Sequence, residues 1–284
     1  MKKIFNAYHP LVIFTYFTAV LAFTMAYMHP FFLLLSVCGA ALTAIYLEGF
    51  GAGRYLLAFG PVVLIAAAVN PLFNHEGGTI LAYFWSGNPL TMESILFGIG
   101  AAVMLAAVML WFFVLNRAMT MEKIMVLFGR VAPGLALLLS MTVRFAGRFR
   151  AQFLQVRRAA ACMGTEQTGR LGKLREAAGI VSVMVTWSFE NGIDTADAMK
   201  SRGYGLPGRS SFSPYRFTKR DGAILGCIIV LCGVIVTGIG LEGIYYTYFP
   251  FFRVETGTWT ATGSSAFLLL CFLPIMLDRM ESNR

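Results

Sequence analysis

The segment closest to a phosphate-binding loop runs from Gly164 to Leu171 and reads GTEQTGRL. A P-loop ends in lysine followed by serine or threonine, which reach the phosphates and magnesium, and it follows a strand. Arg170 and Leu171 stand at these two positions here, and the segment follows a predicted helix. The glycines at 49, 51 and 53 lack the helix and acidic residue of a dinucleotide site. We therefore predict no nucleotide site in this chain.

Neither the histidines nor the cysteines have the spacing of a metal site. His9, His29 and His75 fall at the ends of predicted membrane segments and on different sides, and no H-E-x-x-H motif occurs. The five cysteines form no C-x-x-C pair and mostly stand in apolar runs, which is typical of small buried apolar residues. We expect no metal and no cofactor.

Acidic residues are absent from the middle of the apolar segments. Glu48, Glu93, Glu242 and Asp278 all fall at segment ends. A proton- or ion-coupled carrier places ionisable residues inside the membrane, where function justifies their cost, and a membrane enzyme needs positioned acids, bases or metals. The sequence therefore predicts no catalytic residues and argues against an enzyme. It weakens, without removing, the alternative of a stand-alone secondary carrier.

The composition is that of an integral membrane protein. Of the 284 residues, 57% are hydrophobic and 13% are charged, whereas a soluble domain has about 25% charged residues. A spanning helix needs about 20 mostly apolar residues. We predict an all-α polytopic membrane protein with about six transmembrane helices and long cytoplasmic helices. The six apolar runs cover residues 11–28, 31–47, 55–70, 94–116, 222–241 and 260–277.

Lysine and arginine are unevenly distributed between the loops. The loop 71–93 contains none and the loop 242–259 contains only Arg253, whereas residues 117–220 contain 17 of the 23. Cytoplasmic loops carry the excess of basic residues, so we predict a cell (inner or plasma) membrane protein with both termini cytoplasmic. The predicted organisation is four spans in residues 1–116, a cytoplasmic region in 117–220 and a transmembrane hairpin in 221–284.

The cytoplasmic region has a net charge of +11. Topological bias and the anionic headgroups of the lipid bilayer explain this charge better than nucleic acid does, and we expect no nucleic-acid partner. Few proline or glycine breakers interrupt residues 135–163 and 172–202, which predicts two long helices of roughly 40 Å or more. Apolar residues recur along the first helix at 149, 153, 156, 160 and 163, with Arg157 and Arg158 largely off this stripe.

The second long helix carries an acidic line formed by Glu190, Asp194 and Asp197 at helical spacing. We expect these carboxylates to pair with arginines of the first helix, such as Arg157 and Arg158, and so to support the helix pair. A solvated acidic face is the alternative, because exposed ion pairs are usually weak.

Both long helices are predicted to end at a glycine, Gly164 in one and Gly203 in the other. A glycine just past the last turn adopts the left-handed conformation that ends a helix. Arg202 in the last turn is favoured by the negative end of the helix dipole. This capping role is one interpretation of Arg202, and contact with another protein is the other.

Two segments, RRAAACMG at 157–164 and DAMKSRGYG at 197–205, resemble the transmembrane components of energy-coupling-factor importers, the family that includes cobalt and nickel permeases. The resemblance covers the order of elements over nearly the whole chain and is strongest from Arg144 to Asp221. In that family two coupling helices each end in an Ala-Arg-Gly-like triplet, and its arginine docks into a groove of an ATP-binding subunit. Ser201, Arg202 and Gly203 match this triplet.

The resemblance implies a function and a set of partners. The chain would be the coupling subunit of an ATP-driven micronutrient importer, binding two ATP-binding cassette ATPase subunits and a small substrate-binding membrane subunit. ATP hydrolysis would take place on the ATPases, and Arg202 would transmit their motion. The substrate would be selected by the separate subunit, with vitamins and transition-metal ions both compatible.

The first triplet departs from the family pattern, since Cys162, Met163 and Gly164 contain no arginine. Methionine adapts to irregular apolar surfaces, so Met163 would pack against an apolar groove. The difference between the two tips leads to the hypothesis that the two ATPase sites are not identical.

Overall fold

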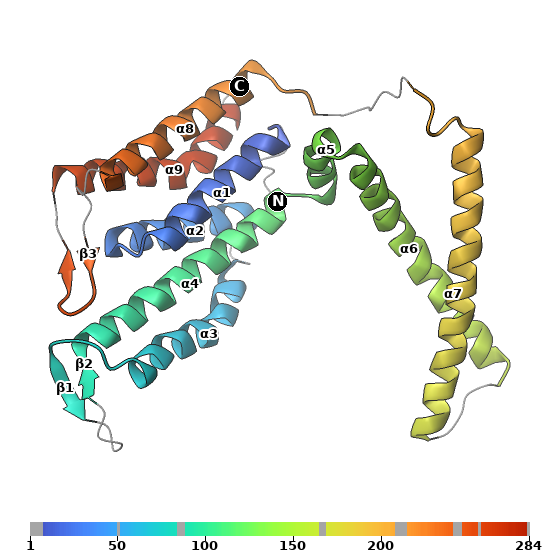
Figure 1. Cartoon of the computed structure of the whole chain (residues 1–284), viewed down its shortest axis with the longest axis horizontal. Helices are drawn as coiled ribbons and strands as arrows, with labels where there is room; N and C mark the ends of the chain where they lie inside the picture. Colours follow the sequence, from blue (N-terminus) through green and yellow to red (C-terminus); the bar gives the residue numbers. More distant parts are fainter. Residues whose placement is uncertain are drawn as a thin grey trace. The chain divides into compact units, whose positions relative to one another are not determined.

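The computed structural model describes residues 8–49, 52–83, 89–164, 169–207, 215–240, 246–254 and 257–282 (Figure 1). The chain divides into two compact units. One contains Met1–Ile124 and Tyr215–Arg284, and the other is Met125–Pro214. The change of unit therefore falls within a helix, after Ile124, and not at residue 117 where the charge pattern changes.

Helices account for nearly all of the first unit. Its helices are α1 (Pro10–Ala26), α2 (Pro30–Glu48), α3 (Ala52–Phe73), α4 (Met92–Ala118), α8 (Lys219–Gly240) and α9 (Thr258–Ser282). Proline at the first position of α1 and of α2 starts these helices without losing a hydrogen bond. α2 packs against α4 and α9, α1 packs against α4 and α8, and α3 packs against α4 (Figure 1).

Four of these helices are long and apolar enough to cross a membrane, namely α2, α4, α8 and residues Thr258–Arg279 of α9. The two other predicted spans correspond to shorter apolar helices, Pro10–Ala26 and Ala58–Phe73. The helical class and the membrane-compatible helices are thus confirmed, whereas six full-length spans are not.

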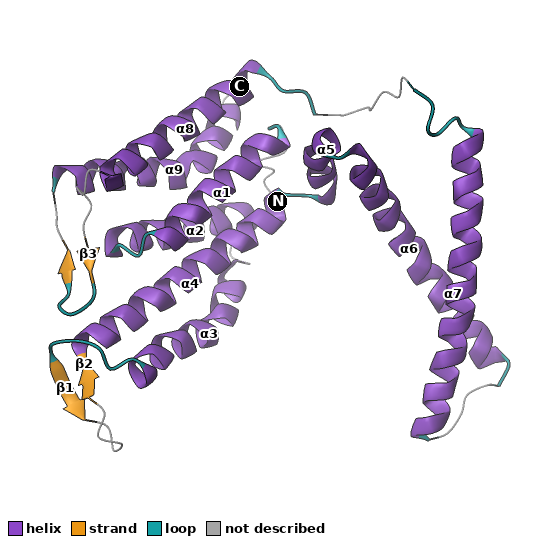
Figure 2. Cartoon of the chain, viewed as in Figure 1, coloured by secondary structure: helices purple, strands orange, loops and turns teal. Residues whose placement is uncertain are grey.

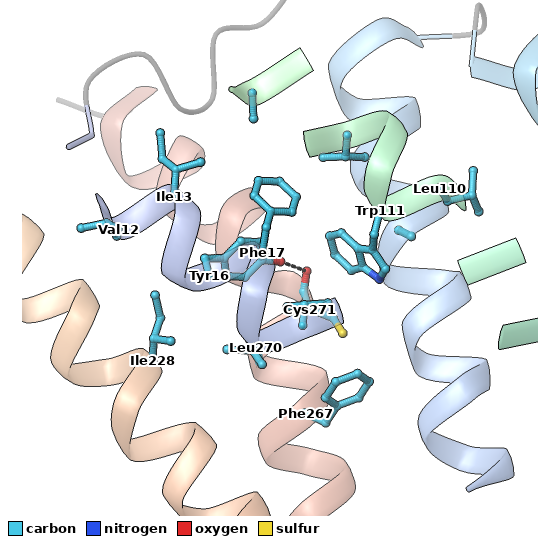
Figure 3. Close-up of a cluster of buried hydrophobic side chains, with 14 of the residues drawn as sticks. Val12, Ile13, Tyr16, Phe17, Leu110, Trp111, Ile228, Phe267, Leu270 and Cys271 are labelled. Atoms are coloured by element: carbon cyan, nitrogen blue, oxygen red, sulfur yellow. Dashed lines mark hydrogen bonds between the residues drawn. The ribbon is translucent and has the colours of Figure 1, made fainter. Parts of the chain in front are cut away.

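The core of this unit is built around aromatic side chains of α1 and α4. Tyr16, Phe17 and Trp111 are buried and make edge-to-face contacts with centroids 5.1–6.2 Å apart. Tyr16 donates a hydrogen bond to the carbonyl of Cys271 on α9, over 3.4 Å (Figure 3). The indole Nε1 of Trp111 donates to Ser36 Oγ over 2.9 Å. Both polar groups are therefore hydrogen-bonded within the bundle, because the hydrocarbon core of a membrane offers them no partner.

Two short antiparallel hairpins, which the apolar and polar pattern does not predict, follow α3 and α8 (Figure 2). β1 (Ile80–Tyr83) pairs with β2 (Pro89–Thr91), and β3 (Tyr246–Thr247) pairs with β4 (Arg253–Val254). A hydrogen bond joins the segment before β1 to the loop between β3 and β4: Gly78 N donates to the carbonyl of Pro250 over 3.0 Å. The strands are too short to show an alternating pattern in the sequence.

Polar contacts join the helix ends that lie away from the hairpins. The backbone N–H of His9 donates to Asp221 Oδ1 over 3.1 Å, which joins the start of α1 to the start of α8. Arg117 pairs with Glu48 over 2.6 Å at the ends of α4 and α2. Asp221, which is buried, thus has its carboxylate hydrogen-bonded at this end of the bundle, as a buried charge requires.

The second unit is dominated by α6 (Pro133–Cys162) and α7 (Arg170–Ser201), which have 30 and 32 residues. At 1.5 Å per residue they are about 45 and 48 Å long, as predicted. The short helix α5 (Met121–Val131) precedes them and contains the boundary between the units. Within the unit, α7 runs back across α6 (Figure 1).

Candidate functional site

The crossing of α6 and α7 is held by aromatic and apolar side chains. Trp187 of α7 stacks on Phe145 of α6 with centroids 5.6 Å apart, and it also contacts Phe149 at 6.4 Å. Ile180 and Met184, on the same face of α7 as Trp187, are buried. Only part of the apolar stripe predicted for α6, such as Phe149, contacts α7. Two helices that cross touch each other over a short length only.

The tip of α7 is a Schellman motif. Gly203 has φ +79°, Gly203 N donates to the carbonyl of Lys200 over 2.9 Å, and Tyr204 N donates to that of Met199 over 3.0 Å. Arg202 is the C-cap residue of α7, and it is exposed. The backbone that carries Arg202 is thus fixed by hydrogen bonds while its guanidinium stays accessible.

The tip of α6 has the same local geometry. Gly164 has φ +69° and its N–H donates to the carbonyl of Ala161 over 3.1 Å. Met163 is the C-cap residue here, with 73% of its surface exposed, and Cys162 is also exposed. Both glycine caps were predicted, and both are confirmed. Both tips therefore end in a left-handed glycine with the same hydrogen bond. They differ in the side chain at the C-cap, a thioether at one tip and a guanidinium at the other.

The predicted ion pairs between the two helices are not formed in the part of the chain that the structure describes. The ion pair that the structure shows joins Arg117 to Glu48 instead. Glu190, Asp194 and Asp197 are exposed on α7, as are Arg157 and Arg158 on α6. The crossing explains this difference, since α6 and α7 diverge on either side of the Trp187 contact. The solvated-face interpretation of the acidic line fits the geometry.

A groove opens between the first half of α6 and the last half of α7, with a volume of about 1320 Å³. Arg144, Arg148, Asp194 and Arg202 line it together with apolar side chains of α6. A smaller pocket of about 390 Å³ lies beside Arg202, between Leu137 and Met141 of α6 and residues 203–207. The residue pattern alone does not predict this groove. The one available signal was the spacing of Arg144 and Arg148, one helical turn apart.

No protein-family model matches this chain, and no curated protein matches it.

Proposed function

We propose that the chain is the transmembrane coupling subunit of an energy-coupling-factor-type importer driven by ATP. The observation that carries this proposal is the tip of α7, where a Schellman motif presents an exposed arginine at the end of a helix about 48 Å long. Guanidinium remains charged and binds carboxylates bidentately. A long helix with such an end transmits a displacement of its partner with little loss.

The partners follow from the difference between the tips. Arg202 docks into an acidic groove of one ATP-binding cassette subunit, and Met163 packs into an apolar groove of a second, non-identical subunit. ATP is bound and hydrolysed on these partners, and the chain itself is not an enzyme. A small membrane subunit captures the vitamin or metal ion and is moved by α6 and α7.

The membrane arrangement belongs to the same proposal. α1, with 17 residues, is at the lower limit for a span. It packs within the bundle of longer apolar helices, as α3 does. We count both as membrane-crossing, which makes six spans in the cell membrane with both termini cytoplasmic.

The test is purification of the tagged chain from its native membranes in mild detergent, followed by mass spectrometry of the proteins recovered with it. We expect one or two ATP-binding subunits with the wild type and, with Arg202→Glu, the loss of at least the subunit that docks at the α7 tip. The matched control is Arg150→Glu, an exposed arginine of α6 away from both tips, which should retain them. Both variants should insert into the membrane normally.

Two outcomes would contradict the proposal. If Arg202→Glu leaves both the recovery of the ATPases and transport unchanged, the α7 tip does not dock an ATPase. Recovery of the chain alone, with transport intact after reconstitution without partners, would identify it as a stand-alone secondary carrier.

A further inference from the structure

The groove between α6 and α7 has one apolar wall. Residues 133–143 of α6 contain no charged side chain, and they supply Leu135, Leu137, Leu138 and Met141 to its lining. Leu135 is 57% exposed and Leu138 is 60% exposed. An apolar wall of this kind favours an occupant that brings apolar surface of its own.

The same groove is positively charged. Arg144 and Arg148 follow the apolar wall along α6, Arg202 comes from α7, and Asp194 is the only acidic residue of the lining. None of these four forms an ion pair within the described part of the chain. Three guanidinium groups against one carboxylate leave a net charge of +2, which favours a ligand with an anionic group.

The order of these features along α6 resembles the profile of a membrane interface. An uncharged stretch comes first and arginines follow it directly. Basic residues in this arrangement lie at headgroup level, with the apolar stretch against the acyl chains. Arginine also matches phosphate geometry, since its fork donates two parallel hydrogen bonds.

We propose that this groove binds an anionic glycerophospholipid, with the phosphate held by Arg144 and Arg148 and an acyl chain lying along Leu135 and Leu138. The lipid occupies a defined site on α6 and α7 and is not merely part of a diffuse charged layer. This inference rests on the second unit alone and not on the proposed function, although Arg202 lines the same groove.

The test uses the full-length chain, purified in detergent, delipidated and titrated with phosphatidylglycerol or phosphatidylcholine under native mass spectrometry. We expect phosphatidylglycerol to bind in preference and the double variant R144Q/R148Q to weaken that binding about 30-fold, from the usual contribution of two basic residues. The matched control is R157Q/R158Q, two exposed arginines of the same helix outside the groove, and it should bind as the wild type does. Leu138→Glu provides an independent variant on the apolar wall, and it should weaken binding as well.

Several results would overturn the proposal. One is an equal loss of phosphatidylglycerol binding in R144Q/R148Q and R157Q/R158Q, which would mean that the lipid is attracted to basic charge in general. Another is equal binding of the two lipids. Competition by inorganic phosphate alone, with no effect of Leu138→Glu, would indicate a simple anion site. Unchanged lipid binding in R144Q/R148Q together with loss of a co-purifying protein would assign the groove to a protein partner. Arg202 is intact in all variants, so recovery of the ATPases is scored separately.

Discussion

His29, between α1 and α2, is a fully buried residue without hydrogen-bond partners for its ring in the described part of the chain. It stacks on Phe31 at 5.6 Å and makes edge contacts with Phe32 at 5.8 Å and Tyr246 at 5.9 Å. Burial lowers the pKa of His29, because the apolar surroundings disfavour the imidazolium.

The titratable groups in contact with His29 and Met28 are phenols. Tyr27 stacks on it, and Tyr246 and Tyr248 hold Met28 by hydrogen bonds to its N–H and carbonyl. Burial raises the pKa of Tyr27 and raises that of Tyr248 to about 12. No carboxylate is among these contacts to offset a charge on the imidazole, so protonation of His29 opposes the native packing of the β3–β4 hairpin.

We predict that acidification destabilises the protein through His29. The folded state binds fewer protons than the unfolded state, because the folded pKa of His29 lies below its ordinary value of about 6.5. Its contribution is therefore complete above pH 6.5 and is lost as the pH falls, with a slope of at most about 1.4 kcal/mol per pH unit. Thermal unfolding in detergent between pH 5 and 8 measures this slope.

The control for this experiment is His29→Phe, which keeps an aromatic ring among the same aromatic neighbours. We expect the variant to be at least as stable as the wild type at pH 8 and to have a shallower pH dependence below 6.5. Parallel curves for the two proteins would show that His29 does not contribute.

At the scale of elements, the bundle depends on close approach between helices. A Cβ on Gly39 of α2 would lie 2.7 Å from the Cβ of Cys271 on α9, which is too close for any side chain. By contrast, a Cβ on Gly226 of α8 would have no neighbouring atom within 4 Å. Two glycines that look alike in the sequence therefore have different roles in packing.

We predict that Gly39→Ala lowers the free energy of unfolding by about 1–3 kcal/mol, because overpacking separates α2 from α9. Gly226→Ala, the matched control, should leave stability unchanged or raise it by up to about 1 kcal/mol through its better helix propensity. Thermal unfolding of both variants in one detergent compares them. Equal melting temperatures would mean that α2 and α9 adjust without cost.

At the scale of the whole molecule, the distribution of basic residues predicts an orientation in the membrane. Tyr83 in the β1–β2 hairpin is 69% exposed, and Asn116 near the end of α4 is also exposed. They lie at the two ends of the bundle. The loop containing Tyr83 has no lysine or arginine, while the basic region begins at Arg117, which predicts that Asn116 is on the cytoplasmic side.

We predict opposite accessibility at these two positions. In a cysteine-free background, a membrane-impermeant maleimide added to intact cells should label Tyr83→Cys and should label Asn116→Cys only after permeabilisation. A variant that retains only the buried Cys271 is the control and should be labelled in neither case. Labelling of Asn116→Cys in intact cells would reverse the topology.

Much of this protein is determined locally, and the sequence alone was sufficient for those parts. Uncharged apolar runs form helices because a bilayer leaves no other partner for the backbone. The ends of α6 and α7 could be predicted because Gly164 and Gly203 meet a local steric requirement of the chain. The cytoplasmic placement of the basic region remains a prediction from the sequence, because charge and membrane side are linked for each loop separately.

Other features depend on residues far apart in the chain, and only the tertiary structure decided them. The crossing of α6 and α7 separates Arg157 and Arg158 from the acidic line that spacing had paired with them, and it brings Arg144 and Arg148 into one groove with Arg202. The apolar surroundings of His29 include Tyr246, more than 200 residues away along the chain. Helical spacing specifies which residues share a face, but the angle at which two faces meet is set by packing.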